Sequence, residues 1–416
     1  MEKGGSRGFG LPTHIRGLQQ WFSATADTPF TSVKVYQHRA TSLVRSNPGP
    51  RRLIFKASAE PPTILLPDGE LSLLSVSQWV IAAQNHAKAL LSEELLFGNT
   101  FSMDIASLKD DWTNEKPGYS VFSDAGNQVH LGSRDALARH IYATPTLREK
   151  FILCSTGTNL VWNVAHLREW LALYAKLDLL CLMLANVTGG APGRITEIVS
   201  MPSANTSYGM RRSLLILHGH VLLTRTYHKQ RHADGQDRFI PHCLDSLLST
   251  VFIYKEALCR PFAQLCAREI WPRSEEAKAR YASYLFNNLP SGRPPCSFGS
   301  SEVTLEMRKW TKKHTGVSLG VQLWRHCSTA FRRRLHCIQE DVIKGRDTAE
   351  SAQAGHSHTV DAMHYGRSKH SIFDLSEDRI YAFLSLSKKW HENLGLEAGE
   401  YIYSRPWNQV CADAFK

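Results

Sequence analysis

The stretch Gly355-His-Ser-His-Thr-Val-Asp-Ala-Met-His-Tyr-Gly-Arg367, late in the chain, places His356 nine residues before Tyr365. Working back from it, basic residues stand in three further motifs: Arg194 in Gly193-Arg-Ile-Thr-Glu197, Lys229 in Tyr227-His-Lys229, and Arg325 in Gln322-Leu-Trp-Arg325. The ordered set of candidate site residues is therefore Arg194, Lys229, Arg325, His356 and Tyr365.

These side-chain types suit the cleavage of a phosphodiester without metal. Negative charge gathers on the non-bridging oxygens in the transition state, and the guanidinium groups of Arg194 and Arg325 would bind such oxygens in a bidentate way. His356 would add a further donor. The Tyr365 hydroxyl can attack phosphorus and form a phosphotyrosine. Lys229 can protonate the departing oxygen. We expect neither a metal nor another cofactor.

Each residue has an ordinary structural explanation when it is taken singly. Arg194 can pair with Glu197 at a helix start, and Arg325 can stack beside Trp324. A lysine in a basic turn is usually solvated, and a tyrosine on a short helix is usually half-buried packing. The agreement in order, residue type and spacing favours a shared site over these explanations.

The set resembles the tyrosine recombinase (phage integrase) family. The family pattern is an arginine at a helix start, a lysine in a β-hairpin, a His/Lys-x-x-Arg box, and Gly-His-Ser with a tyrosine nine residues later. Arg194, Lys229, Arg325, His356 and Tyr365 match these elements in turn. The resemblance covers about residues 155–370. In the residues of its motifs the chain most resembles fungal Crypton-type mobile-element recombinases and related domains beside telomere-linked helicases.

The resemblance carries implications for fold and function. It implies a mainly α fold with a small antiparallel β-sheet (α+β), preceded by a helical N-terminal module. It also implies site-specific DNA recombination or integration through a 3′-phosphotyrosyl intermediate. The implied partner is double-stranded DNA, bound by a tetramer of this chain, without a membrane. The implied location is the nucleus.

One position departs from the family pattern. Gln322 stands where the third box normally has His or Lys. Glutamine can form hydrogen bonds but cannot act as a base near neutral pH, so His326 is a candidate substitute. Gln322 leaves open the alternative of a domesticated DNA-binding protein that does not cleave. A topoisomerase-like enzyme, which would use the same chemistry to relax DNA by strand rotation, is a second alternative.

Composition agrees with a folded protein that has a polyanionic partner. The chain has 416 residues, 43% of them hydrophobic, and a formal net charge of +11, which favours nucleic acid first and an anionic membrane surface second. The nine cysteines include no Cys-x-x-Cys motif, and we expect them to be reduced thiols. A zinc site from His326, Cys327, His336 and Cys337 has unusual ligand spacing. The sequence contains no Gly-Lys-Ser/Thr phosphate-binding loop, so we do not expect the chain itself to be a helicase.

Hydrophobic periodicity predicts helices and one small sheet. The strongest helix spans 159–188, and we expect its apolar part to be buried rather than to cross a membrane because it contains Lys176 and Asp178. A hairpin is predicted at 213–217 and 220–226. The further predictions are a third strand at 237–241, a short helix from Arg194 to about Met201, and helices at 77–96, 133–141, 243–260, 274–288, 302–314, 321–337, 359–366 and 376–393.

We divide the chain into three regions. Residues 1–70 are expected to be irregular, 71–150 to form a helical DNA-clamping module, and 151–416 to form the catalytic domain with a C-terminal helix. We expect Arg332-Arg-Arg334 to be available for contacts with the DNA backbone. The apolar face of the helix at 376–393 is a hypothetical docking surface for a neighbouring protomer.

Overall fold

The computed structural model describes residues 28–46, 53–156, 159–217, 219–225, 239–335 and 377–399. The chain divides into two compact units, Met1–Ile54 and Phe55–Lys416. In the first unit, helix α2 (Pro29–Ser46) follows Thr28, whose Oγ1 accepts a hydrogen bond from the backbone N–H of Thr31 at 3.2 Å. Such a side-chain acceptor satisfies one of the free N–H groups of the first turn.

A small sheet leads into the first helix of the second unit. Strands β1 (Ile54–Phe55), β2 (Thr63–Leu66) and β3 (Gly69–Ser72) form it, and α3 (Leu73–Ala89) then continues as the π-helical turn η1 (Leu90–Leu95). The predicted helix at 77–96 is therefore confirmed. It begins earlier because the side chain of Ser72 caps the N–H of Ser75 at 3.0 Å. Residues 1–70 were expected to be irregular, but their described part contains regular structure, namely α2, β1, β2 and the start of β3.

Short elements fill the region before the longest helix. They are η2 (Ile105–Ser107), η3 (Ala125–Asn127), α4 (Gln128–Leu131), α5 (Ala136–Ala143), α6 (Pro145–Phe151), and the paired strands β4 (Ile152–Thr156) and β5 (Asn159–Trp162). The long helix α7 (Val164–Thr188) begins later than the expected residue 159. Residues 159–162 pair with β4 instead, and Asn163 caps the helix by accepting from the N–H of Ala165 at 3.2 Å.

Helix α7 is the central helix of the second unit. By length and composition alone it is apolar enough to cross a membrane, and 78% of its most apolar window is buried within the protein. Its acidic residue Asp178 is fully buried and pairs with Lys255 at 2.6 Å. This burial agrees with the expectation of a core helix.

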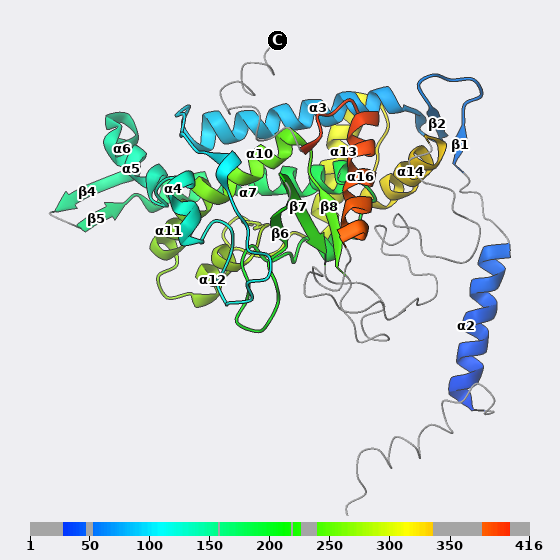
Figure 1. Ribbon diagram of the computed structural model, residues 1–416, viewed down its shortest axis with the longest axis horizontal. Coiled ribbons are helices and arrows are strands. Elements are labelled where there is room, and N and C mark those ends of the chain that lie inside the picture. The colour runs from blue at the N-terminus through cyan, green and yellow to red at the C-terminus, as the bar shows by residue number, and fades with distance from the viewer. Residues whose placement is uncertain are drawn as a thin grey trace, which may run out of the picture. The chain divides into compact units, whose positions relative to one another are not determined.

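A three-stranded antiparallel sheet lies beside α7 (Figure 1). Its strands, in spatial order, are β6 (Leu214–Leu217), β7 (His220–Arg225) and β8 (Ile240–Cys243). The predicted hairpin is confirmed, and the third strand begins three residues later than expected. The remaining elements are α8 (Ile195–Ile198), α10 (Ser246–Tyr254), η4 (Lys255–Cys259), α11 (Arg260–Ile270), α12 (Glu275–Ser283), α13 (Ser300–Thr315), α14 (Val321–Arg334) and α16 (Glu377–Asn393). The described structure is thus mainly helical with small antiparallel sheets.

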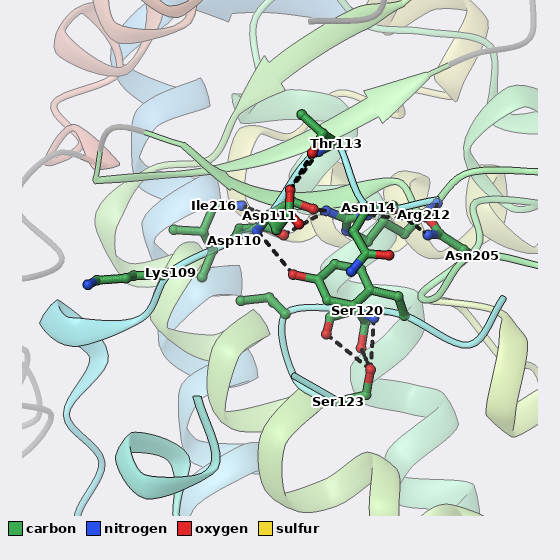
Figure 2. Close-up of polar contacts among 12 residues, drawn as sticks. Lys109, Asp110, Asp111, Thr113, Asn114, Ser120, Ser123, Asn205, Arg212 and Ile216 are labelled. Atoms are coloured by element: carbon green, nitrogen blue, oxygen red, sulfur yellow. Dashed lines mark hydrogen bonds and ion pairs between the residues drawn. The ribbon is translucent and has the colours of Figure 1, made fainter. Parts of the chain in front are cut away.

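The outer edge of β6 is covered by the segment at 109–118. The carboxylate of Asp110 accepts from the backbone N–H of Ile216 at 2.9 Å and pairs with Arg212 at 2.7 Å (Figure 2). Arg212 also donates to the carbonyl of Asp111 at 2.8 Å and lies over the ring of Tyr119. An uncovered edge strand would offer its backbone groups to another chain, so this segment protects the sheet.

Three tryptophans join distant parts of the second unit in one core. Trp79 of α3 lies 6.4 Å from Trp324 of α14, and Trp324 lies 6.5 Å from Trp390 of α16, between ring centroids. All three are fully buried. Helix α3, which belongs to the region expected to clamp DNA, therefore shares its core with the C-terminal helices. The clamping role stays a prediction.

The hypothesis that α16 docks on a neighbouring protomer is wrong for three of the four apolar residues that suggested it, whereas the fourth, Leu386, is half-buried. Ile380, Phe383 and Leu384 are buried in one cluster with Leu222 and Cys243 of the sheet of the same chain. Figure 1 shows α16 lying along β8. The apolar periodicity of the helix correctly indicated a buried face, but the partner is the chain's own sheet.

Burial of His391 on α16 predicts a dependence of stability on acidity. Burial lowers the pKa of His391 to about 3, from 6.5 in the unfolded chain. The folded state therefore favours the neutral ring, and its contribution to stability is complete above pH 6.5 and is lost as the pH falls. We expect His391 to reduce the free energy of unfolding by about 2 kcal/mol near pH 5.

Urea unfolding at several pH values measures this effect. Between pH 6.5 and pH 5, the unfolding free energy of the unsubstituted chain should change with pH more steeply than that of His391→Leu. The difference in slope should correspond to about one proton bound on unfolding. His242, whose pKa burial also lowers, should leave a residual slope. An identical slope in both proteins would show that His391 is not buried as a neutral ring.

Candidate functional site

Arg194 stands at the start of α8, directly after the glycine-rich turn that ends α7. Its backbone N–H donates to the Oε2 of Glu197 at 3.4 Å, and its guanidinium lies 3.9 Å from Oε1 of the same carboxylate. The Arg194 side chain remains 39% exposed. The sequence predicts a helix that reaches about Met201, and the free N–H groups and the dipole of its first turn would favour a phosphate beside Arg194. The helix instead ends at Ile198, and a single turn has little dipole to offer.

Arg325 lies on α14 and faces the same turn. Its Nε donates to the backbone carbonyl of Pro192 at 3.3 Å. Burial lowers the pKa of Arg325, the charge of Arg194 lowers it further, and Glu197 opposes both. Among the described residues, no carboxylate lies within ion-pair distance of Arg325. The two predicted arginines are thus brought together, although they are far apart in the sequence.

A hollow of about 430 Å³ opens where α8, α13 and the start of α14 meet. Its basic lining residues are Arg194, Arg308 and Arg325, and its hydroxyl-bearing lining residues are Thr196, Ser300, Thr304 and Ser318. None of the residues that line it is acidic. Cationic forks and hydroxyl donors around an open space suit a phosphate or another oxyanion.

Gln322 lines the hollow one helical turn before Arg325. Gln322 therefore lies at the same hollow as the two arginines. His326, the candidate substitute, is exposed and is not among the lining residues. Its position on α14 gives no support to the substitution.

The basic run at the end of α14 differs in part from the expectation. Arg332 is buried and is not available to DNA, because the helix turns this position toward the core beside Phe331. Arg333 and Arg334 are exposed, and the guanidinium of Arg334 lies 5.9 Å from the ring centroid of Phe55. Only these two residues of the run remain candidates for backbone contacts.

The other three predicted site residues, Lys229, His356 and Tyr365, lie outside the described residues, as does the predicted helix at 359–366. The structure therefore describes the arginine part of the candidate site. Along the chain, Lys229 follows four residues after Arg225, the last residue of β7.

Two residues that sequence reasoning missed lie under the arginines. Arg225 pairs with Glu197, at 2.6 Å between Nη1 and Oε2, and donates from Nε to His242 Nε2 at 2.8 Å. Arg225 and His242 belong to the sheet and are buried between apolar neighbours in their strands. A charged residue at the end of β7, close behind the apolar residues Val221, Leu222 and Leu223, was the one signal that could have drawn attention to Arg225.

Other features of the described residues do not compete with this site. A larger hollow of about 560 Å³ shares no lining residue with this site, and its lining includes Glu256 and Arg260, which pair with each other. In the described ranges no cluster of three or more His, Cys, Asp or Glu residues has the geometry of a metal site. The seven described cysteines are free thiols, and five of them are buried.

Comparisons with protein-family models, curated proteins and solved structures give no match to this chain. The resemblance to tyrosine recombinases therefore rests on the quoted motifs. What the structure adds is a mainly helical fold with small antiparallel sheets and the convergence of Arg194 and Arg325 on one hollow.

Proposed function

We propose that this protein cleaves and rejoins DNA strands through a 3′-phosphotyrosyl intermediate, as a site-specific recombinase or integrase of a mobile element. The scissile phosphate binds in the hollow beside Arg194 and Arg325. Tyr365 is the nucleophile, and His356 and Lys229 complete the site. Double-stranded DNA is the substrate, bound by a homo-oligomer in the nucleus.

The observation that carries the proposal is the environment of Arg325. Its guanidinium is half-buried, has a pKa lowered by burial and by Arg194, and faces a hollow without acidic lining residues. Bringing a second guanidinium near a first is unfavourable unless an anion offsets the repulsion, and Glu197, whose close partner is Arg225, offsets it only in part. A phosphate between them would supply that anion.

The order of elements along the chain is a second support. The lysine of the family stands in a β-hairpin, and Lys229 belongs to the segment that connects the antiparallel strands β7 and β8. Arg225 at the end of β7 lies close enough to Arg194 and Arg325 for their charges to lower its pKa. The segment with Lys229 therefore starts beside the arginine pair.

The proposed chemistry conserves the energy of the phosphodiester. The oxygen of Tyr365 bonds to phosphorus while the bond from phosphorus to the 5′-oxygen breaks, and Lys229 gives a proton to that oxygen. Arg194, Arg325 and His356 stabilise the charge on the phosphoryl oxygens. A 5′-hydroxyl from a partner strand then attacks and restores a diester. Gln322 cannot take the phenol proton, so water or another side chain must do so.

A pool of nicked duplexes of random sequence tests the proposal. The nick lets the short 5′-hydroxyl fragment diffuse away after cleavage, so the covalent protein–DNA adduct accumulates and can be seen on a denaturing gel. We expect the unsubstituted chain to form the adduct and Tyr365→Phe to form none, with equal duplex binding by both. An adduct that persists in Tyr365→Phe would assign the nucleophile elsewhere.

Gln322 favours a second candidate function, a DNA-binding protein that keeps the arginine site but does not cleave. In the same assay such a protein would bind duplex without forming an adduct. Gln322→His then becomes informative, because it restores the family's residue at a position that lines the hollow. An adduct formed only by Gln322→His would establish a binding protein with a lost base.

A further inference from the structure

Arg225 links the sheet to the arginine site from below. Its side chain is only 1% exposed. One side of the guanidinium pairs with Glu197 at 2.6 Å, and Nε donates to His242 at 2.8 Å. Burial lowers the pKa of Arg225, Glu197 raises it, and the charges of Arg325 and Arg194 lower it again. Arginine stays charged in such surroundings, so a fixed positive charge lies close to Arg194 and Arg325.

His242 extends this contact to the turn that carries Arg194. Because Arg225 can only donate, His242 Nε2 must accept, and the ring proton lies on Nδ1. Nδ1 then donates to the carbonyl of Gly189 at 3.0 Å. The same carbonyl accepts from the hydroxyl of Ser387 on α16 at 2.9 Å. The first residue of the turn is thus held from β8 and from α16.

Gly193, the residue before Arg194, packs directly on the guanidinium of Arg225. A Cβ at Gly193 would lie 2.4 Å from Nη1 and 2.8 Å from Cζ of Arg225. Glu197 and His242 hold that guanidinium, so it has little room to give way. The glycine allows the backbone of the turn to lie against a buried charge, and this contact fixes the last residue before Arg194.

The position of Glu197 explains why Arg194 is not fully neutralised. The Oε2 of Glu197 is 2.6 Å from Arg225 Nη1, whereas the Arg194 guanidinium is 3.9 Å from Oε1. The strong pair therefore belongs to the buried arginine. Without Arg225, the buried carboxylate would need a new cation, and Arg194 is the nearest one, since it already lies at the edge of ion-pair distance.

We infer that Arg225 is a positioning residue for the phosphate site, acting through Glu197, Gly193 and His242. It holds the turn at 189–197 against the sheet, and it occupies Glu197 so that Arg194 stays available to a phosphate. It also connects two elements: strand β7, which precedes Lys229 in the chain, and the turn that carries Arg194. This inference rests on the proposed function.

Hydrogen–deuterium exchange of the full chain tests the positioning without any DNA. Arg225→Lys keeps a positive charge but cannot bind Glu197 and His242 together, so residues 189–199 should exchange at least about tenfold faster. Arg212→Lys is the matched control, because Arg212 is equally buried and pairs with Asp110 at 2.7 Å (Figure 2). It should speed exchange at 109–118 and not at 189–199. Equal exchange of 189–199 in both variants would overturn the inference.

Adduct formation on the nicked duplexes tests the consequence for chemistry. We expect Arg225→Met to lower the adduct rate about 100-fold, and Arg225→Met/Glu197→Gln to recover at least about tenfold of that loss. The recovery is expected because the second substitution removes the carboxylate that would capture Arg194. A purely structural role predicts no recovery, and that result would also overturn the inference.

The two tests separate this inference from the proposed function. If the unsubstituted chain forms no adduct, the cleavage proposal fails, and inorganic phosphate replaces DNA as the probe. Its affinity should then fall at least about fivefold in Arg225→Met and return in the double variant. Unchanged phosphate affinity across the three proteins would refute the positioning role.

Discussion

Replacing Arg325 with alanine is expected to lower the rate of covalent adduct formation about 1000-fold. The change removes a guanidinium that is half-buried and lines the hollow, so it acts on charge that develops in the transition state. Duplex binding depends on many phosphate contacts and should weaken only a few-fold. Single-turnover adduct formation on the nicked duplexes at saturating protein measures the effect.

The control for this prediction lies on the same helix. Arg333→Ala also removes one positive charge from α14, but Arg333 is exposed and does not line the hollow. It should change duplex affinity slightly and leave the rate at saturation unaltered. Equal rate losses in both variants would mean that Arg325 contributes only general charge, and the assignment of the site would be wrong.

Arg194→Ala should resemble Arg325→Ala, and the double variant should be little slower than either single one. Residues that act together on one transition state show such non-additivity. Fully additive losses would indicate that the two arginines bind different phosphates. The geometry favours one shared phosphate, because Arg194 and Arg325 line the same hollow.

The largest effect on stability is expected at Asp178, in the middle of α7. Its carboxylate pairs with Lys255 at 2.6 Å and accepts from the backbone N–H of Asn287 at 2.8 Å, and both charged side chains are fully buried. Asp178→Leu leaves the buried Lys255 ammonium with only part of the negative charge that offsets it. We expect the free energy of unfolding to fall by about 3–5 kcal/mol, a large fraction of the ~5–15 kcal/mol of typical domains.

Two further variants show whether the cost comes from the unpaired charge. Asp178→Leu/Lys255→Met removes both charges and should recover most of the loss, because a buried pair can be replaced by apolar residues of similar volume. Asp135→Ala breaks a pair of similar length, 2.7 Å to Arg139, in which both side chains are exposed. It should cost at most about 0.5 kcal/mol. Urea unfolding measures all three, and equal losses at Asp178 and Asp135 would contradict the argument.

Much of the secondary structure could be predicted because it depends on local pattern. The apolar residues of α7 and the hairpin of β6 and β7 appear where periodicity and turn residues place them. Boundaries were less accurate: α7 begins at Val164 and not at 159, since the capping residue Asn163 and the pairing of β4 with β5 decide its start. Neither of these effects is contained in helical periodicity.

The candidate site was predicted in part. Arg194 and Arg325 meet at one hollow, and Gln322 lines it. The sequence could not show that Arg225 and His242 lie close to this site. The pattern of one strand indicates which of its own residues are apolar, but not what they contact. Which residue of a neighbouring element meets a buried charge depends on the register of the sheet, in which Arg225 pairs with Ile240.

By itself, the sequence determined the residue types available for chemistry, the net charge of +11, and the apolar faces of the main helices. Only the tertiary structure decided what those faces meet. It buried α16 on the chain's own sheet, turned Arg332 into the core, and gave Glu197 to Arg225 rather than to Arg194. The physical reason is that periodicity records how strongly a face avoids water, whereas packing and charge pairing depend on distances between segments that are remote in the chain.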